Sequence, residues 1–247
     1  MILQIFEYEL IGFITLLLPP KLSCVLQPPI FPLGIRIDEP VTTLTDLLVA
    51  TMCFYAYFKL RKLGTSSVLK RYTLAYFLLM GLATALGGLI GHGFLYALGF
   101  GWKLPGWLLS MLAINLLERV IIRYSKAVLK PKTIQYLGWF NIVELLVFAG
   151  LAFGYLNFRF VEIHSMYGLL IVVFGFCVYN WLRGNRDEVI VNFMKATLFA
   201  ALAAVVFILK LAPHQWFNHA DFAHIFMFIS AWFFYRGSRC ILVPQIN

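Results

Sequence analysis

The sequence predicts an all-α integral membrane protein, a bundle of seven transmembrane helices with its N-terminus outside and its C-terminus in the cytoplasm. Three observations predict this class: the composition, the apolar runs and the uneven placement of Lys and Arg. Hydrophobic residues make up 62% of the 247 residues and charged residues 13%, whereas soluble domains carry about 25% charged residues. A soluble protein could not hydrate so apolar a surface, so the composition argues against a soluble class.

Seven apolar runs supply the expected spans, each near the length of about 20 residues that crosses a bilayer. They cover 41–58, 72–99, 105–122, 134–156, 163–182, 190–211 and 219–236. Together they define a transmembrane domain over 41–236, followed by a cytoplasmic tail over 237–247. The second run is long enough to be tilted, or to be broken near Gly87, Gly88 and Gly91.

Basic residues set the orientation, because Lys and Arg accumulate in cytoplasmic links. The links after the first, third, fifth and seventh spans carry most of them, whereas the other links carry only Lys103, Arg159 and Lys210. The net charge of +9 therefore reflects topology and contact with anionic membrane lipids. It does not indicate nucleic acid, and the oligomeric state stays open. The expected location is the inner membrane of a bacterium or an endomembrane of a eukaryote.

Residues 1–40 form a separate N-terminal segment. The stretch from Ile2 to Leu18 is apolar but contains Glu7 and Glu9, and several prolines follow it. A signal peptide would need a basic start and a small-residue cleavage site, and neither is present. We expect an interfacial segment or an extra helix.

Ionisable residues gather towards one side of the predicted membrane. All five histidines fall at or near the outer ends of the spans: His92, His164, His214, His219 and His224. Ionisable groups in hydrocarbon cost several kcal/mol, of order 3, unless they are paired or hydrated. The sequence therefore predicts a shared polar cavity near the extracytoplasmic face. His164 is expected to be a residue of the membrane interface, with a place in the cavity wall as the alternative.

The first span carries a polar stripe. Glu39, Thr42 and Asp46 are spaced by three and four residues, and Val49 and Cys53 continue the same spacing. Such spacing places side chains on one helical face. We expect this face to point into the bundle. A second interpretation, that Glu39 and Thr42 only cap the helix, stays open.

The start of the last span brings an acid and imidazoles together. Asp221 and His224 are three residues apart and share a face, whereas His219 precedes His224 by five. With His92 from the second span, these residues are suited to hold a divalent metal ion that activates water. In the alternative interpretation Asp221 caps the helix and the histidines are interfacial.

Three carboxylates are the candidate catalytic groups. Asp46 and Glu39 are placed to orient a metal ligand or to act as general base, and Asp221 lies between the two histidines of the last span. They complete the predicted site near the outer face.

A second polar set lies deeper in the membrane. Asn115 and Glu118 on the third span, and Asn141 and Glu144 on the fourth, are pairs three residues apart on neighbouring helices. We expect interhelical hydrogen bonds that hold the bundle together. A proton or ion path would also place acids here.

These features resemble the CREST superfamily of seven-helix membrane hydrolases, which includes the alkaline ceramidases, the Per1-type lipid-remodelling proteins and the adiponectin-receptor relatives. The resemblance rests on the topology, on His92 late in the second span, and on His219 and His224 in the seventh. It implies zinc bound by these three histidines and cleavage of a lipid amide or ester. Three departures are visible. Gly88 stands where the family has a serine, and the last two histidines are five rather than four residues apart. The third span carries no aspartate after His92, and Asn115 is its nearest polar residue.

Three other functions are consistent with the same residues. An ion- or proton-coupled transporter would use the acids of the first, third and fourth spans. A haem-binding protein would use His92 and His224 as axial ligands. A non-catalytic membrane sensor would use none of them chemically.

Overall fold

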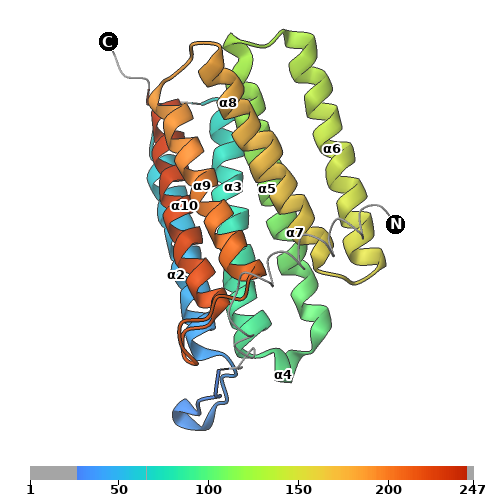
Figure 1. Ribbon diagram of the computed structural model, residues 1–247, viewed down its shortest axis with the longest axis vertical. Coiled ribbons are helices and arrows are strands. Elements are labelled where there is room, and N and C mark those ends of the chain that lie inside the picture. Colours follow the sequence, from blue (N-terminus) through green and yellow to red (C-terminus); the bar gives the residue numbers. More distant parts are fainter. Residues whose placement is uncertain (1–26, 65, 244–247) are drawn as a thin grey trace.

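A computed structural model describes residues 27–64 and 66–243, and this part of the chain is built from helices (Figure 1). Within it, six helical segments are long and apolar enough to cross a membrane. They are Pro40–Arg61, Val68–Gly93, Phe100–Ala127, Pro131–Gly154, Arg159–Leu182 and Glu188–Ile208. These segments coincide with the first six predicted spans and are compatible with an integral membrane protein.

The seventh predicted span is also a helix. It is α10, His219–Leu242, which has 24 residues and packs along α9 (Glu188–Ile208) and α2 (Pro40–Arg61). It is not among the six most apolar segments, because its first turns carry polar residues. The helix continues six residues past the predicted end at Arg236, and its last turns bury Ser238 and Leu242.

Two of the segments change from α-helix to π-helix along their length. In the second, α3 (Val68–Leu86) leads into the π-helix η2 (Gly87–Gly93), where the sequence predicted a break. In the fifth, α7 (Arg159–Met166) and α8 (Phe174–Leu182) flank the π-helix η5 (Tyr167–Val173). π-helical turns are found mostly at functional sites, and each of these two lies at or beside a histidine.

The remaining elements are two long helices, joined by a short connection, and several other short elements. The long helices are α5 (Leu104–Tyr124) and α6 (Pro131–Gly154). The short elements are η1 (Pro32–Gly34), α4 (Leu95–Leu98), η3 (Phe100–Lys103) and η4 (Ser125–Ala127).

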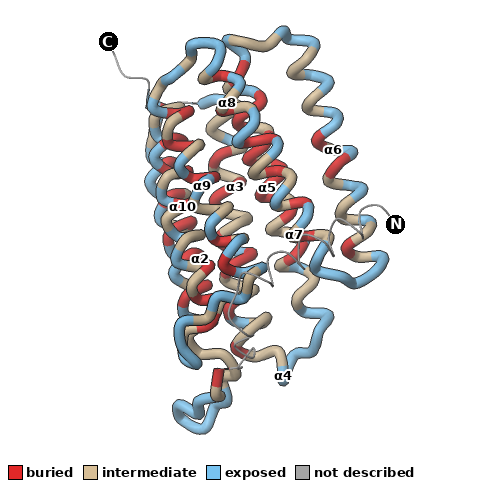
Figure 2. Tube along the Cα trace, viewed as in Figure 1, coloured by how far each residue is buried: buried red, intermediate tan, exposed pale blue. Residues whose placement is uncertain are grey.

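The apolar core lies between α2, α3, α5, α9 and α10. Phe77, Phe193 and Phe234 are among its fully buried side chains. Figure 2 shows that α6 stands at one edge and is largely exposed, with contacts to α5 and α7. Because the core is apolar, the polar clusters that interrupt it stand out as candidate sites.

The N-terminal segment is described only from residue 27. The prediction of an interfacial or extra helix for 1–40 therefore falls mostly outside the described residues. In the described part, Ile30 and Ile37 pair as an antiparallel bridge around η1, and the chain enters α2 at Pro40. Gln27 is buried against the bundle, with 3% of its surface exposed.

Candidate metal centre between α2, η2 and α10

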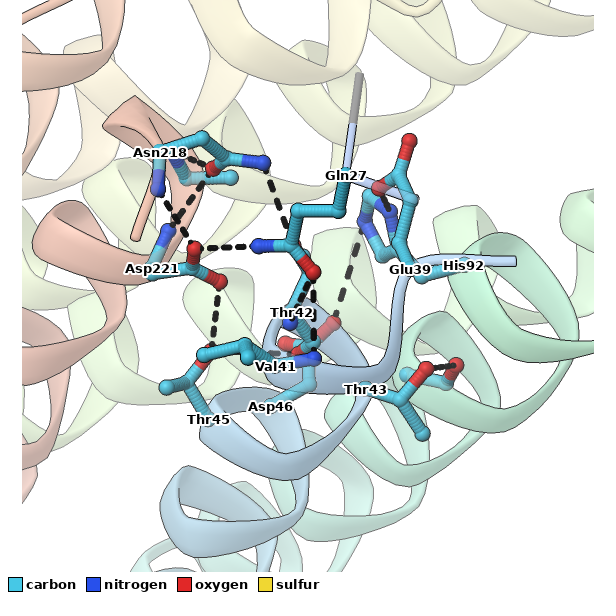
Figure 3. Close-up of polar contacts among 12 residues, drawn as sticks. Gln27, Glu39, Val41, Thr42, Thr43, Thr45, Asp46, His92, Asn218 and Asp221 are labelled. Atoms are coloured by element: carbon cyan, nitrogen blue, oxygen red, sulfur yellow. Dashed lines mark hydrogen bonds and ion pairs between the residues drawn. The ribbon is translucent and has the colours of Figure 1, made fainter. Parts of the chain in front are cut away.

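Three segment ends meet at one end of the bundle, the lower end in Figure 1. The α2 helix begins there at Pro40, η2 ends there at Gly93, and α10 begins there at His219. A hydrogen bond from Asp38 N to Gly93 O, 3.2 Å long, ties the first two together. This meeting point collects most of the predicted site residues (Figure 3).

Asp46 lies between two histidines, and we call Asp46, His92 and His224 the His–Asp–His cluster. His224 Nε2 is 3.3 Å from Asp46 Oδ1, and His92 Nε2 is 3.9 Å from Asp46 Oδ2. The two ring centroids are 6.5 Å apart. Asp46 is only 6% exposed. One buried carboxylate thus presents a different oxygen to each imidazole.

The second nitrogen of each imidazole is held by another side chain. His92 Nδ1 lies 2.5 Å from Glu39 Oε2, and His224 Nδ1 lies 2.9 Å from Thr45 Oγ1. The Thr45 hydroxyl also reaches Asp221 Oδ1 at 3.3 Å, so it can donate to that carboxylate while accepting from His224 Nδ1–H. Both Nε2 lone pairs then face Asp46. Metal-binding histidines are typically oriented in this way.

The ligand types of this cluster suit a divalent metal ion, but its three ligand atoms do not all lie within 4.8 Å of one another, so the two rings would have to move closer together around an ion. Two imidazole nitrogens and a carboxylate are ligands that zinc and other first-row metals accept, with bond lengths of about 2.0–2.2 Å. Two lone pairs that face a carboxylate repel it unless a proton or a cation lies between them. A haem is not favoured, because the Asp46 carboxylate occupies the space between His92 and His224.

Glu39 lies just before α2 and is an anion suited to hold the His92 ring. Burial raises the pKa of its carboxyl, but the hydrogen bond to His92, the electrostatic attraction of that ring and the nearby charge of Lys103 outweigh this and lower the pKa below its ordinary value. The carboxylate is therefore ionised near neutral pH. It accepts the hydrogen on His92 Nδ1, which leaves Nε2 free.

Gly88 allows η2 to approach α2. A Cβ atom at this position would lie 2.8 Å from Asp46 Cβ and 3.0 Å from Thr43 O. The Thr43 hydroxyl donates to Gly88 O at 3.2 Å. Position 88 is therefore closed to any side chain, since Asp46 fills the space beside it.

Asp221 closes a capping box at the start of α10, as the alternative interpretation predicted. Its Oδ2 accepts from Asn218 N at 2.6 Å, and the Asn218 side chain accepts from Asp221 N and Ala220 N. Its Oδ1 accepts from the Thr45 hydroxyl. Asp221 thus acts on the cluster through Thr45, so the structure places it as a positioning residue.

Gln27 is a member of the site that the sequence analysis missed. Its amide donates to Asp221 Oδ2 at 2.6 Å, and its carbonyl accepts from Val41 N at 3.0 Å and Thr42 N at 3.4 Å. It satisfies the free amides at the start of α2. The predicted capping by the Glu39 side chain is wrong, because that carboxylate is bound to His92.

His219 does not join the cluster. Its ring packs against Phe207, with centroids 5.3 Å apart. Among the described residues, no hydrogen bond or ion pair links it to Asp46, His92 or His224. Five residues of helix turn a side chain by about 140°, so His219 and His224 point to different sides of α10. The structure replaces His219 by Asp46 as the third candidate ligand.

His164 is also not where the sequence analysis expected it. It is completely buried, with its Nδ1 2.6 Å from Glu144 Oε1. The interpretation as an interfacial histidine is wrong, because α7 begins at Arg159 and places His164 in its second turn. It belongs to the deeper polar set, in which Asn115 Nδ2 donates to Asn141 O at 2.7 Å.

The described residues form an all-helical protein with membrane-compatible helices and, at one end, a His–Asp–His constellation around the buried Asp46. The chain belongs to DUF6962, a family of unknown function whose model matches residues 41–242. The matched range begins in α2 and ends with α10, so it contains the whole His–Asp–His cluster. No curated protein and no solved structure matches the chain.

Proposed function

We propose that this protein is a zinc-dependent membrane hydrolase that cleaves an amide or ester bond of a membrane lipid. One observation carries the proposal: both Asp46 oxygens face imidazole nitrogens whose partner nitrogens are already held. The proposed ligands are His92, His224 and Asp46. The resemblance to the CREST hydrolases supports the reaction class.

The proposal includes α10 as a seventh span. Its polar residues Asp221 and His224 are directed to α2, where Thr45 and Asp46 meet them, so they need not face lipid. Seven spans put the two ends of the domain on opposite sides. The links rich in Lys and Arg lie at the end away from the cluster, which supports a position of the cluster near the extracytoplasmic face.

The residues around the proposed zinc ion have different roles. A zinc ion bound there would supply a Lewis acid that polarises the scissile carbonyl and activates water. Glu39 Oε2 keeps the hydrogen on His92 Nδ1, and Thr45 orients His224. The Asp46 carboxylate completes the ligand set and balances part of the charge.

The surroundings support a reactant that arrives from one side. The His92 and Glu39 side chains are 31% and 22% exposed, whereas Asp46 is closed off. The polar bond of a lipid would reach the cluster at this partly open edge, beside His92 and Glu39.

The test uses purified protein in lipid nanodiscs, with a fluorescent ceramide and a fluorescent phospholipid ester as substrates. We expect wild type to retain zinc and to cleave at least one substrate. His92→Ala, His224→Ala and Asp46→Asn each remove a ligand worth several kcal/mol, so activity falls about 10³-fold. His214→Ala is the matched control, because this exposed histidine lies outside the cluster and its ring only accepts from Trp216 N. Wild type without zinc, or variants with full activity, would contradict the proposal.

A further inference from the structure

A second set of metal-binding side chains lies deeper in the bundle, and we call Glu118, Glu144 and His164 the Glu–Glu–His cluster. They come from α5, α6 and α7, and each offers a ligand atom within 4.8 Å of the others. Their exposed fractions are 1%, 7% and 0%. We propose that this cluster binds a second divalent metal ion, in a site separate from the proposed active site and independent of its function.

The orientation of His164 supports a metal ligand. Its Nε2 lies 3.1 Å from Met111 O, and a carbonyl oxygen can only accept, so Nε2 carries the hydrogen. Its Nδ1 therefore points to Glu144 Oε1, 2.6 Å away. Histidines that bind metals commonly donate their other N–H to a backbone carbonyl in this way. With its Nε2–H donated to Met111 O, the ring can offer Nδ1 to a metal ion once the proton that it shares with Glu144 is released.

The carboxylates of the cluster hold oxygen atoms that no donor satisfies. Glu118 Oε1 and Glu144 Oε2 are buried without a hydrogen-bond partner, and so is the amide oxygen of Asn141. Buried polar atoms are nearly always paired. Among the described residues, no Lys or Arg forms an ion pair with either glutamate. Arg119, the neighbour of Glu118, donates instead to Gly138 O at 2.9 Å.

Within the described residues, the ion-pair partner of these glutamates is His164, which pairs with Glu144 when its ring is protonated. A carboxylate buried away from water is costly unless it is paired or neutralised. Asn141 Nδ2 donates to Glu118 Oε2 at 2.9 Å, which satisfies only one of the four carboxylate oxygens. His164 satisfies one more at Glu144. A bound cation would satisfy the remaining two at once.

The π-helix η5 keeps space beside Glu118. A Cβ atom at Gly168 would overlap Glu118 Oε1 and Ile114 Cγ2. A pocket of about 140 Å³ lies next to the cluster and is lined by Glu118, Asn141 and Tyr167 among others. This pocket is the proposed route of an ion to Glu118, although Glu144 and His164 do not line it.

The ligand types indicate the kind of ion. One imidazole with two carboxylates and a neighbouring amide oxygen suits Mn²⁺, Fe²⁺ or Zn²⁺. Soft ions such as Cu(I) prefer sulfur ligands, which this cluster lacks, and Mg²⁺ and Ca²⁺ prefer oxygen alone. Mn²⁺ is the practical probe, since it binds both ligand types.

The test is a metal count. Wild type, Glu118→Gln and Glu162→Gln are purified, incubated with Mn²⁺ and freed of unbound ion by gel filtration. Glu162 is the matched control, because it lies on the same helix as His164 but outside the cluster. We expect Glu118→Gln to hold one metal ion fewer per chain than wild type and Glu162→Gln. His224→Ala should instead lose the ion of the proposed active site and retain this one, so failure of either site is seen separately.

Equal metal content in Glu118→Gln and wild type would overturn the proposal and leave the cluster as a proton-binding group. If Glu118→Gln does not fold, anomalous scattering from wild-type crystals soaked in Mn²⁺ decides the question. A peak between Glu118, Glu144 and His164 is the expected result. Full occupancy of Mn²⁺ elsewhere in the same crystals, without a peak here, would contradict the proposal.

Discussion

The His–Asp–His cluster and the Glu–Glu–His cluster use similar side chains in opposite surroundings. The first lies where α2 and α10 begin, and a hydroxyl and a carboxylate near these ends hold its two rings. The second lies between the middles of α5 and α6 and the second turn of α7, and it leaves two carboxylate oxygens without a partner. A site at helix ends is organised by the protein itself, whereas a site between helix middles depends more on what it binds.

The largest expected effect comes from breaking the buried pair that His164 forms with Glu144 in the Glu–Glu–His cluster. Removing one partner of a buried ion pair costs about 3–5 kcal/mol, whereas replacing both by apolar residues costs much less. His164→Leu should lower the free energy of unfolding by that amount, and His164→Leu with Glu144→Leu by clearly less. Unfolding in detergent, followed by circular dichroism, measures both. Equal losses in the single and double variants would show that the two side chains do not form a coupled pair.

A smaller effect concerns the groups that hold the rings of the His–Asp–His cluster. Loss of such a partner typically costs 10–100-fold in metal affinity or activity, an order-of-magnitude range. Glu39→Ala and Thr45→Val should each reduce zinc affinity within about this range, because His92 or His224 loses its fixed orientation. Competition against a zinc chelator gives the affinities. Thr51→Val on the exposed side of α2 is the control. An equally large loss of zinc affinity in this variant would show that the loss does not come from the orientation of the two rings.

Alanine substitutions at two glycines test the comparison between the two clusters further. Alanine at Gly88 would meet Asp46 and Thr43, and alanine at Gly168 would meet Glu118 and Ile114. Overpacking of this kind costs about 1–3 kcal/mol. Each variant should disturb its own cluster and leave the metal content of the other unchanged.

The control for this pair is Gly175→Ala in α8, where a Cβ would have open space. Alanine is favoured over glycine in a helix by roughly 0.5–1 kcal/mol, so this variant should be as stable as wild type or more stable. Thermal unfolding of the three proteins gives the comparison. A loss at Gly175 equal to that at Gly88 or Gly168 would mean that close approach is not the cause.

The smallest expected effect is at His219. Because its ring packs on Phe207 outside the cluster, His219→Phe should change stability by no more than about 0.5 kcal/mol, as surface substitutions usually do. Zinc content and hydrolysis should stay at the wild-type level. Loss of zinc in this variant would restore His219 as a ligand and exclude the ligand set proposed above.

The sequence predicted the helices well because apolar runs of membrane length have few alternatives. The first predicted span, 41–58, corresponds to the helix Pro40–Arg61. The glycines around Gly88, where a break was predicted, lie in the π-helix. Asp46 could be found because it falls two turns inside an apolar helix, where a carboxylate needs a partner.

The site was predicted less completely, for reasons that spacing explains. His219 was included through the resemblance to the CREST hydrolases, although five residues do not return to one helical face. In the structure its ring packs on Phe207, and His224 is the histidine that faces Asp46. His164 was misplaced because the expected span began at residue 163, four residues after the real start of α7. Gln27 could not be found, because no periodicity describes the path of the segment before α2.

The most direct test is zinc X-ray absorption spectroscopy of the Glu118→Gln protein, in which only the His–Asp–His cluster should hold zinc. The account predicts one zinc ion per chain with two imidazole ligands and carboxylate or water oxygen, at distances of about 2.0–2.2 Å. A spectrum with fewer than two imidazoles, or a protein without zinc, would contradict it.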